Sequence, residues 1–258
     1  MCLAVLALDA HPRFALVLAA NRDEFHARPA LAAAWGTHAP FHDILSGRDL
    51  AAGGTWLGVH RDGRFAFVTN VRQGTGRDPA ARSRGELVPR VLAPGVRLEE
   101  VFAELAHHGQ AYNGFNLLAG DAAGARWMSN RDAGARNLAP GVHGLSNATL
   151  DTPWPKVVRT KAALARWVAR ADEASDTLFA ALADRTGAPD ADLPATGVTL
   201  ERERVLAAPF IVSPGYGTRC STVFTIDRER CARFEERSFG PDGEPQGTVV
   251  ESFTLAAQ

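Results

Sequence analysis

Residues 2–25 read CLAVLALDAHPRFALVLAANRDEF and contain the clearest secondary-structure signal of the chain. Two continuous apolar runs, residues 2–8 and 14–20, are separated by residues 9–13, a segment of turn-forming character. Short apolar runs joined in this way predict a β-hairpin. Because each run is apolar throughout instead of alternating, we expect both strands to be covered on both faces.

The rest of the chain alternates between strand patterns and helix patterns. Further strands are expected at residues 55–60, 64–70, 114–120, 126–130, 220–227, 231–239 and 247–255. A first helix pair follows Ser83, which has the spacing of a capping box with Glu86, and includes an apolar stripe over residues 98–105. A second pair is expected at residues 154–172 and 176–185, because Pro155 suits a first helical position.

This order of elements predicts a single α+β domain over residues 1–258. Its simplest packing is a four-layer αββα sandwich, in which two antiparallel sheets pack face to face and a helix pair covers each outer face. That packing buries strands on both faces, as the apolar runs require.

The composition of the 258 residues is that of an ordinary soluble protein, with 46% apolar residues, 22% charged residues and a formal net charge of −1. It indicates no nucleic-acid partner. No apolar stretch reaches the roughly 18 residues that span a bilayer, so stable membrane insertion is not expected. Cys2, Cys220 and Cys231 do not form a disulfide framework, which favours a cytoplasmic location, and we expect Cys220 and Cys231 to be buried thiols. No His or Cys spacing typical of a metal site is present, and no cofactor is expected.

Cys2 directly follows the initiator methionine, and two interpretations of this position are open. In one, Cys2 is a small buried residue at the start of a strand. In the other, removal of Met1 makes Cys2 the N-terminal residue. Its α-amine, with a pKa of about 7.7–8.0, then accepts the thiol proton, so that one residue supplies both nucleophile and base.

Residues 21–24, Asn-Arg-Asp-Glu, follow the second apolar run. If the two runs pair as an antiparallel hairpin, these side chains return beside Cys2. An arginine there favours the thiolate, and a carboxylate there holds the ammonium form of the amine. A solvated strand end is the alternative interpretation of the same four residues.

Ordered motifs cover the whole chain: Met1-Cys2, NRDEF at 21–25 with Arg28-Pro29, GGTWLGV at 53–59, TNVR at 69–72, SRGELV at 83–88, GLSNATLDTPWPKV at 144–157 and GTRCSTVFTID at 217–227. In this combination the chain resembles the NRDE family, also called the transport-and-Golgi-organisation family. That family is similar to the N-terminal nucleophile (Ntn) hydrolases, which have the αββα sandwich. The penicillin V acylase and bile salt hydrolase group among them uses a cysteine after the removed methionine.

The resemblance implies a set of catalytic residues. Cys2 matches the nucleophile, and Arg22 with Asp23 resembles the arginine and aspartate around its thiol and amine. The charges of residues 21–24 are contiguous, unlike those of the acylase group, so Glu24 is the alternative acidic partner. This departure leaves the amidase assignment open and does not affect the fold.

Three residues further along complete the implied catalytic set. Asn70 resembles an oxyanion-hole amide, Asn147 resembles the asparagine of a Thr-Asn-Ser-Pro-like stretch, and Arg219 resembles a second site arginine. Alternatively, the two asparagines only organise turns and Arg219 is a surface residue. Residues expected to contact substrate are Asn21, Glu24, Trp56, Arg72, Arg84 and His143.

Two functions from different classes follow. The first is an N-terminal-cysteine hydrolase or acyltransferase that acts on an amide C–N bond or a thioester of a small acylated substrate. The second is a non-catalytic protein that holds an acyl-CoA, a lipid or haem in the same pocket, because eukaryotic members of the resembled family are associated with haem handling and lipid metabolism. The arginine-rich segment 72–84 is expected to close over an anionic ligand or to remain a solvated loop.

Overall fold

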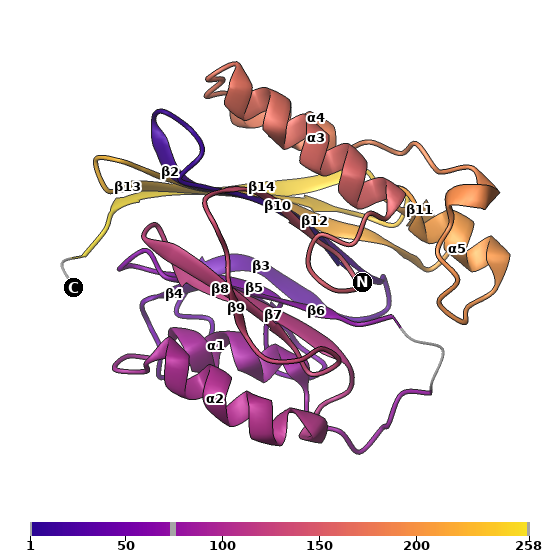
Figure 1. Ribbon diagram of the computed structural model, residues 1–258, viewed down its shortest axis with the longest axis horizontal. Helices are drawn as coiled ribbons and strands as arrows, with labels where there is room; N and C mark the ends of the chain where they lie inside the picture. Colours follow the sequence, from indigo (N-terminus) through magenta and orange to yellow (C-terminus); the bar gives the residue numbers. More distant parts are fainter. Residues whose placement is uncertain (1, 73–75, 257–258) are drawn as a thin grey trace.

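The computed structural model describes residues 2–72 and 76–256. Two antiparallel sheets pack face to face, and helices lie on both outer faces (Figure 1). The four-layer αββα arrangement expected from the order of strands and helices is therefore confirmed. Residues 73–75 of the arginine-rich segment lie outside the described residues, as does Met1.

The first sheet has the order β10 (Gly141–Leu145), β1 (Cys2–Leu8), β2 (Phe14–Phe25), β12 (Tyr216–Asp227), β13 (Cys231–Phe239) and β14 (Pro245–Thr254), with β11 (Val212–Ser213) beside β12. The second sheet follows chain order: β3 (Ala30–Trp35), β4 (Ile44–Asp49), β5 (Leu57–His60), β6 (Phe65–Asn70), β7 (Phe115–Asp121), β8 (Gly124–Ser129) and β9 (Arg136–Asn137).

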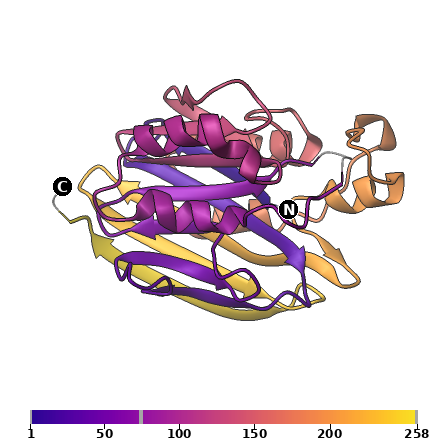
Figure 2. The ribbon, with the colours of Figure 1, turned by 90° about the horizontal axis from the view of Figure 1, so that it is seen from below.

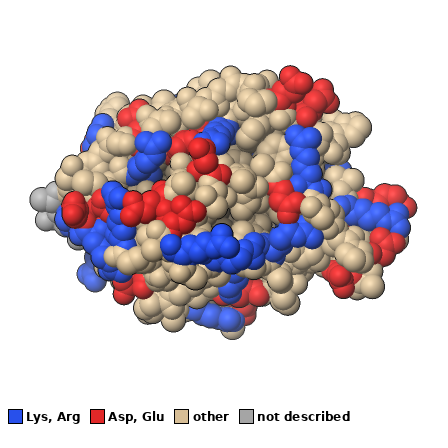
Figure 3. Space-filling model, turned by 90° about the horizontal axis from the view of Figure 1, so that it is seen from above, with Lys and Arg blue, Asp and Glu red and all other residues tan. Residues whose placement is uncertain are grey.

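The helices form the two outer layers. Helices α1 (Leu87–Leu92) and α2 (Leu98–His108) lie across the second sheet (Figure 2), whereas α3 (Pro155–Ala169) and α4 (Ser175–Leu182) cover the first. A short α5 (Leu200–Leu206) lies at the end of the first sheet near β11 (Figure 1). The face above α3 and α4 carries basic and acidic side chains interspersed (Figure 3), with ion pairs such as Arg159–Asp184 at 3.5 Å.

Strand β1 is buried on both of its faces, which explains why its sequence is apolar throughout. Leu6 and Leu8 belong to the core between the sheets, whereas Val5 and Ala7 pack in the cluster formed with α3 and α4. Successive side chains of a strand point to opposite faces, so a strand covered on both faces has to be apolar at every position. The expected hairpin is confirmed, with β1 and β2 paired antiparallel from Leu8↔Leu16 to Cys2↔Arg22.

The expected end of the second strand at residue 20 was wrong, because β2 continues to Phe25. Its polar residues are paired inside the protein instead of ending the strand. Asn21 donates from Nδ2 to the carbonyls of Leu182 and Pro209 at 2.8 and 2.9 Å, and it accepts from Ser221 at 2.6 Å. These bonds let a polar stretch remain a buried strand.

Other differences are local. Ser83 precedes a 3₁₀ turn over Arg84–Glu86 and its side chain makes no cap bond; the Glu86 carboxylate instead accepts from Tyr112 at 2.6 Å. The capping-box prediction was therefore wrong. Strands β3, β4, β9, β10 and β11 and helix α5 were not predicted. Cys220 is buried as expected, but Cys231 is exposed, which corrects that expectation.

Candidate functional site

Strand register brings Cys2 next to Arg22. Arg22 pairs with Cys2 on one side and with Cys220 on the other, so it occupies the middle one of three adjacent strands. The Cys2 side chain is buried, and its thiol receives a hydrogen bond from the backbone amide of Asp23. The Cys2 carbonyl accepts from Ser146 Oγ at 2.9 Å, which anchors the start of β1 to the segment after β10.

The surroundings of Cys2 act on the pKa of its thiol in opposite directions. Burial raises the pKa of the Cys2 thiol, and the nearby Asp23 carboxylate acts in the same direction. The charge of the amino terminus and, more weakly, the Arg22 guanidinium act against both, because a positive charge stabilises the thiolate. The thiol is therefore not activated by its surroundings alone, and a nucleophilic role requires a base that removes its proton.

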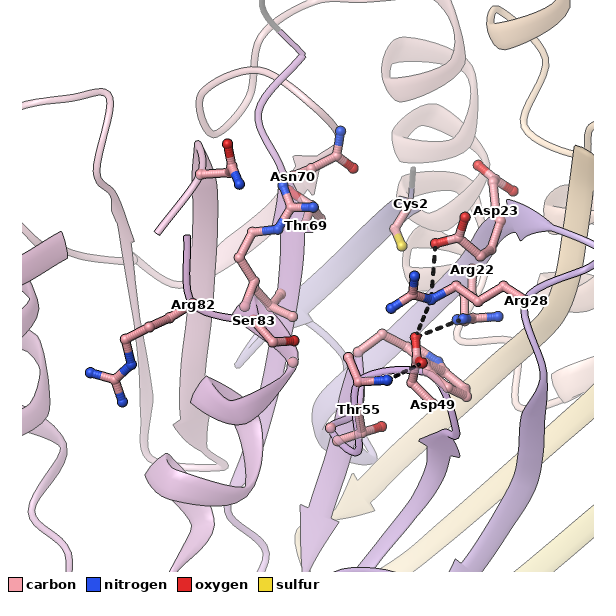
Figure 4. A pocket seen from close by; sticks show the side chains of 18 of the residues that line it. Cys2, Arg22, Asp23, Arg28, Asp49, Thr55, Thr69, Asn70, Arg82 and Ser83 are labelled. Atoms are coloured by element: carbon pink, nitrogen blue, oxygen red, sulfur yellow. Dashed lines mark hydrogen bonds and ion pairs between the residues drawn. The ribbon is translucent and has the colours of Figure 1, made fainter. Parts of the chain in front are cut away.

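Cys2 opens into a pocket between the two sheets. Figure 4 shows Cys2 with Thr69 and Asn70 on one side and Arg22 and Asp23 on the other. Charged side chains dominate the wall. Its arginines are Arg22, Arg28, Arg77, Arg82 and Arg84, and its carboxylates are Asp23, Glu24 and Asp49. The five arginines against three carboxylates leave the pocket suited to an anionic ligand.

Arg22 is held rigidly in this wall. Its guanidinium lies over the Trp56 ring at 4.3 Å and has Nη2 3.5 Å from Asp49 Oδ2. The same Asp49 oxygen accepts from Arg28 Nε at 2.6 Å. The buried Arg22 Nη1 has no hydrogen-bond partner among residues 2–72 and 76–256. A fixed guanidinium with a spare donor is a ready partner for a thiolate or a substrate oxygen.

Asn70 and Asn147 act as a pair. Asn147 is fully buried, and its Nδ2 donates to Asn70 O at 3.0 Å and to Asn70 Oδ1 at 3.1 Å. Asn70 lines the Cys2 pocket, whereas Asn147 does not. Because Asn70 Oδ1 is used as an acceptor, its Nδ2 group is the donor that this side chain retains. Asn147 orients this amide from behind.

Besides Asn147, the structure places four of the expected site residues away from the Cys2 pocket. Asn21 faces α4 through the bonds described above. Arg219 Nη1 donates to the carbonyls of Phe25, His26 and Arg28 at 3.1–3.3 Å, so it fixes the turn after β2. Arg72 is buried 3.1 Å from Glu203, and His143 binds Asp151 at 3.0 Å. Glu24, Trp56 and Arg84 do line the pocket.

A turn-to-turn contact shapes one wall. A Cβ built on Gly54 would overlap the backbone carbonyl group of Gly85, and Thr55 N donates to Gly85 O at 3.0 Å. Only glycine permits this close backbone approach. The contact joins the Gly-Gly-Thr-Trp and Ser-Arg-Gly-Glu motifs and explains why both are glycine-containing.

Comparison with known sequences decides the family. A family model described as "Transport and Golgi organisation 2" matches residues 1–241. The chain belongs to this family. It is 36% identical over 260 residues to the human "Transport and Golgi organization protein 2 homolog", covering 92% of this chain and 93% of the relative. The bovine homolog is 37% identical, with 99% of each chain covered, and the Drosophila melanogaster protein is 28% identical over 97% of this chain and 98% of its own. The resemblance seen in the motifs is confirmed.

Solved structures with a similar fold are also known. One is the Caenorhabditis elegans N-acylethanolamine-hydrolyzing acid amidase ortholog, with a TM-score of 0.49, 11% identity and coverage of 86% of this chain and 92% of that one. Another is the C2A mutant of the conjugated bile acid hydrolase from Clostridium perfringens, with a TM-score of 0.49, 8% identity and coverage of 100% and 99%.

Sequence reasoning missed Asp49, which lines this candidate site, and the buried Lys156, whose charge acts on Asp23. Arg77 and Arg82 were covered only by the expectation for the segment 72–84. Asp49 and Lys156 each lie close to a quoted motif, before Gly-Gly-Thr-Trp and inside Pro-Trp-Pro-Lys. Within the described residues, no group of three His, Cys, Asp or Glu side chains is placed to hold a metal ion. None of the described helices is long and apolar enough to cross a membrane.

Proposed function

We propose that the chain is an N-terminal-cysteine hydrolase, in which Cys2 attacks the amide or thioester carbonyl of a small acylated substrate that carries an anionic group. The observation that carries this proposal is the Cys2 thiol beside the fixed Arg22 guanidinium and the Asn70 amide, at one pocket. The family name itself specifies no reaction, so the argument depends on the chemistry of these residues.

Activation of the thiol depends on processing of the chain. Removal of Met1 would place the free α-amine of Cys2 on the same residue as the thiol, where the neutral amine takes the thiol proton. The thiolate then forms a C–S bond to the substrate carbonyl carbon. The leaving amine or thiol departs with a proton, and water or another acceptor releases the acyl group and restores Cys2.

The oxyanion of the tetrahedral intermediate needs donors that are in place before reaction. Asn147 donates to the backbone carbonyl of Asn70 and to Asn70 Oδ1, so the second bond orients the Asn70 amide, which lines the pocket beside Cys2. Loss of one such donor typically costs about 2.7–4 kcal/mol in catalysis. Arg22 Nη1 is a further donor on the opposite side of the thiol.

The pocket wall favours a small polar substrate. Arg77 and Arg84 lie on the segment opposite Arg22, where they suit a carboxylate or phosphate, whereas the Arg82 guanidinium is paired with Glu86. Sites for haem or long acyl chains are mostly apolar, whereas the apolar side chains in this wall, within the described residues, are mainly those of Ala52, Trp56 and Val68.

One observation favours the non-catalytic alternative. Burial raises the pKa of the Cys2 thiol, which keeps a thiol protonated and unreactive at neutral pH. In that case the same pocket would hold an acyl-CoA, lipid or haem ligand without turnover.

The deciding experiment is a mass map of the N-terminal peptide after incubation with short acyl thioesters and amides, each with and without a carboxylate. A protein that lacks Met1 and carries an acyl adduct on Cys2 supports the hydrolase. The control is Cys231→Ser, which removes the exposed thiol and leaves the pocket intact. A ligand that copurifies with the Cys2→Ala protein, together with an unmodified Cys2 in the native chain, supports the binding protein.

A further inference from the structure

Lys156 occupies an unfavourable position for a lysine. Its side chain is 1% exposed, and Nζ has no hydrogen-bond partner within the described ranges 2–72 and 76–256. It is also the second residue of α3, at the positive end of the helix dipole, where a further cation is destabilised. Buried, unpaired amines are costly and are retained where an opposite charge compensates them.

The compensating charge is Asp23. Asp23 is also 1% exposed and lies on the face of β2 that carries Val17 and Ala19, the face covered by α3 and α4. Among the charges that act on Lys156, that of Asp23 is the strongest, and Lys156 is in turn the strongest charge acting on Asp23. Figure 1 shows the first turn of α3 at the same end of the molecule as the start of β1.

The other charged neighbours are committed elsewhere or lie on the far side. Glu203 of α5 is 3.1 Å from Arg72, and it accepts hydrogen bonds from Thr196. Asp23 itself accepts from Thr218 Oγ1 at 2.7 Å. Among the described residues, the other titratable or charged groups that face this pair are Cys2 of β1, Arg22 of β2 and Tyr216 of β12. The charge of the amino terminus also acts on Asp23.

We propose that Lys156 is a positioning residue of the site, whose ammonium group is the counter-charge that keeps the Asp23 carboxylate ionised beside Cys2. The inference extends the proposed function, since an ionised Asp23 is what would hold the α-ammonium group of Cys2 between turnovers. The lysine touches neither the substrate pocket nor the reacting atoms, and it acts through Asp23.

The test compares Lys156→Met with Lys161→Met. Both substitutions remove a lysine from α3, but Lys161 is partly exposed and paired with Asp151 at 2.6 Å. Burial raises the pKa of Asp23, and loss of the lysine charge raises it further. Ionised Asp23 has then lost the strongest opposite charge that acts on it, so the Tm deficit of Lys156→Met grows as the pH rises from 5 to 8, whereas that of Lys161→Met stays small across this range.

Two further measurements complete the test. In a substrate that the native protein turns over, the acid limb of the kcat/KM profile of Lys156→Met moves to higher pH by about one unit or more, and that of Lys161→Met does not move. The double variant Lys156→Met with Asp23→Asn regains most of the Tm lost at pH 8, because neither buried charge remains.

The outcomes separate this inference from the proposed function. If no substrate is turned over, the hydrolase proposal fails, and the pH dependence of Tm still decides whether Lys156 pairs with Asp23. If turnover is present but the acid limb of Lys156→Met stays in place, Lys156 has no positioning role. A Tm deficit that is equal at pH 5 and pH 8, and that Asp23→Asn does not relieve, overturns the pairing itself.

Discussion

Replacement of Asn147 by alanine should impair catalysis from a residue that does not line the pocket. Asn147 Nδ2 makes two hydrogen bonds to Asn70, at 3.0 and 3.1 Å, and the side chain is fully buried. Each bond contributes about 0.5–1.5 kcal/mol net, so the variant is expected to lose about 1–3 kcal/mol of unfolding free energy. It also frees the Asn70 amide to rotate away from the pocket.

The catalytic loss is expected to equal that of Asn70→Ala. If Asn70 supplies one oxyanion donor, its removal costs about 2.7–4 kcal/mol, or a kcat lower by about 10²–10³. Asn147→Ala removes the same donor indirectly, so the double variant should be no slower than the worse of the two single variants. Urea unfolding measures the loss of unfolding free energy, and kcat for the best acyl substrate measures the loss of catalysis.

The comparison has a clear refuting result. If the losses in kcat of the two single variants multiply in the double variant, the two amides act independently and Asn147 does not work through Asn70. If Asn70→Ala turns over substrate as fast as the native chain, the oxyanion assignment is wrong. Asn116→Ala is a suitable control, because Asn116 is equally buried and donates to Thr69 and to Ala148 without touching Asn70.

Three other perturbations test the walls of the pocket. Asp49→Asn should lower the unfolding free energy at pH 7 by about 1.5–3 kcal/mol, because it removes the charge-assisted hydrogen bond from Arg28. Burial raises the pKa of Asp49, but this bond outweighs the burial and holds the pKa below its ordinary value. In urea unfolding, the difference in stability between the native chain and the variant should therefore fade as the pH falls below 4. Gly54→Ala should destabilise by about 1–3 kcal/mol through overlap with Gly85, and a melting curve that matches the native one would contradict the close backbone contact. Arg77→Gln should raise KM for substrates with a carboxylate more than for neutral analogues, and the difference should shrink in 1 M salt; equal KM changes for both substrate types would count against an anionic ligand.

The fold was predictable where the residue pattern of a strand by itself indicated its pairing and its burial. The runs at residues 2–8 and 14–20 specify a hairpin and show that both faces are covered, and the hairpin register alone puts Cys2 opposite Arg22. The continuation of β2 to Phe25 was not predictable in this way. The partners of Asn21, the carbonyls of Leu182 and Pro209, are 161 and 188 residues away in sequence, so the polar stretch looked like a strand end.

The same distinction between local and long-range information applies to the candidate site. Residues that local pairing brings to Cys2 were found, whereas those supplied by packing between layers were not. Asp49 reaches Arg22 across the two sheets, and Lys156 acts on Asp23 through its charge from the first turn of α3. Conversely, Arg219 lies in a motif and His143 lies directly before one. Arg219 nevertheless donates to carbonyls of the turn after β2, and His143 bonds to Asp151 and to the carbonyl of Ala139.

The state of Arg22 links the catalytic and binding interpretations of the pocket. A buried guanidinium nitrogen without a partner costs about 1–3 kcal/mol or more, and Nη1 of Arg22 is in this position among the described residues while Trp56 and Asp49 prevent the side chain from turning away. The penalty disappears when Nη1 meets an acceptor. A Cys2 thiolate supplies one, as does a substrate oxygen, and either would make the bound or reacting state the one in which Arg22 is fully paired. The same unpaired donor therefore opposes the effect of burial, which raises the pKa of the Cys2 thiol. Without a ligand, Cys2 should react more slowly with neutral alkylating agents than with substrates that bring an anionic group to this wall.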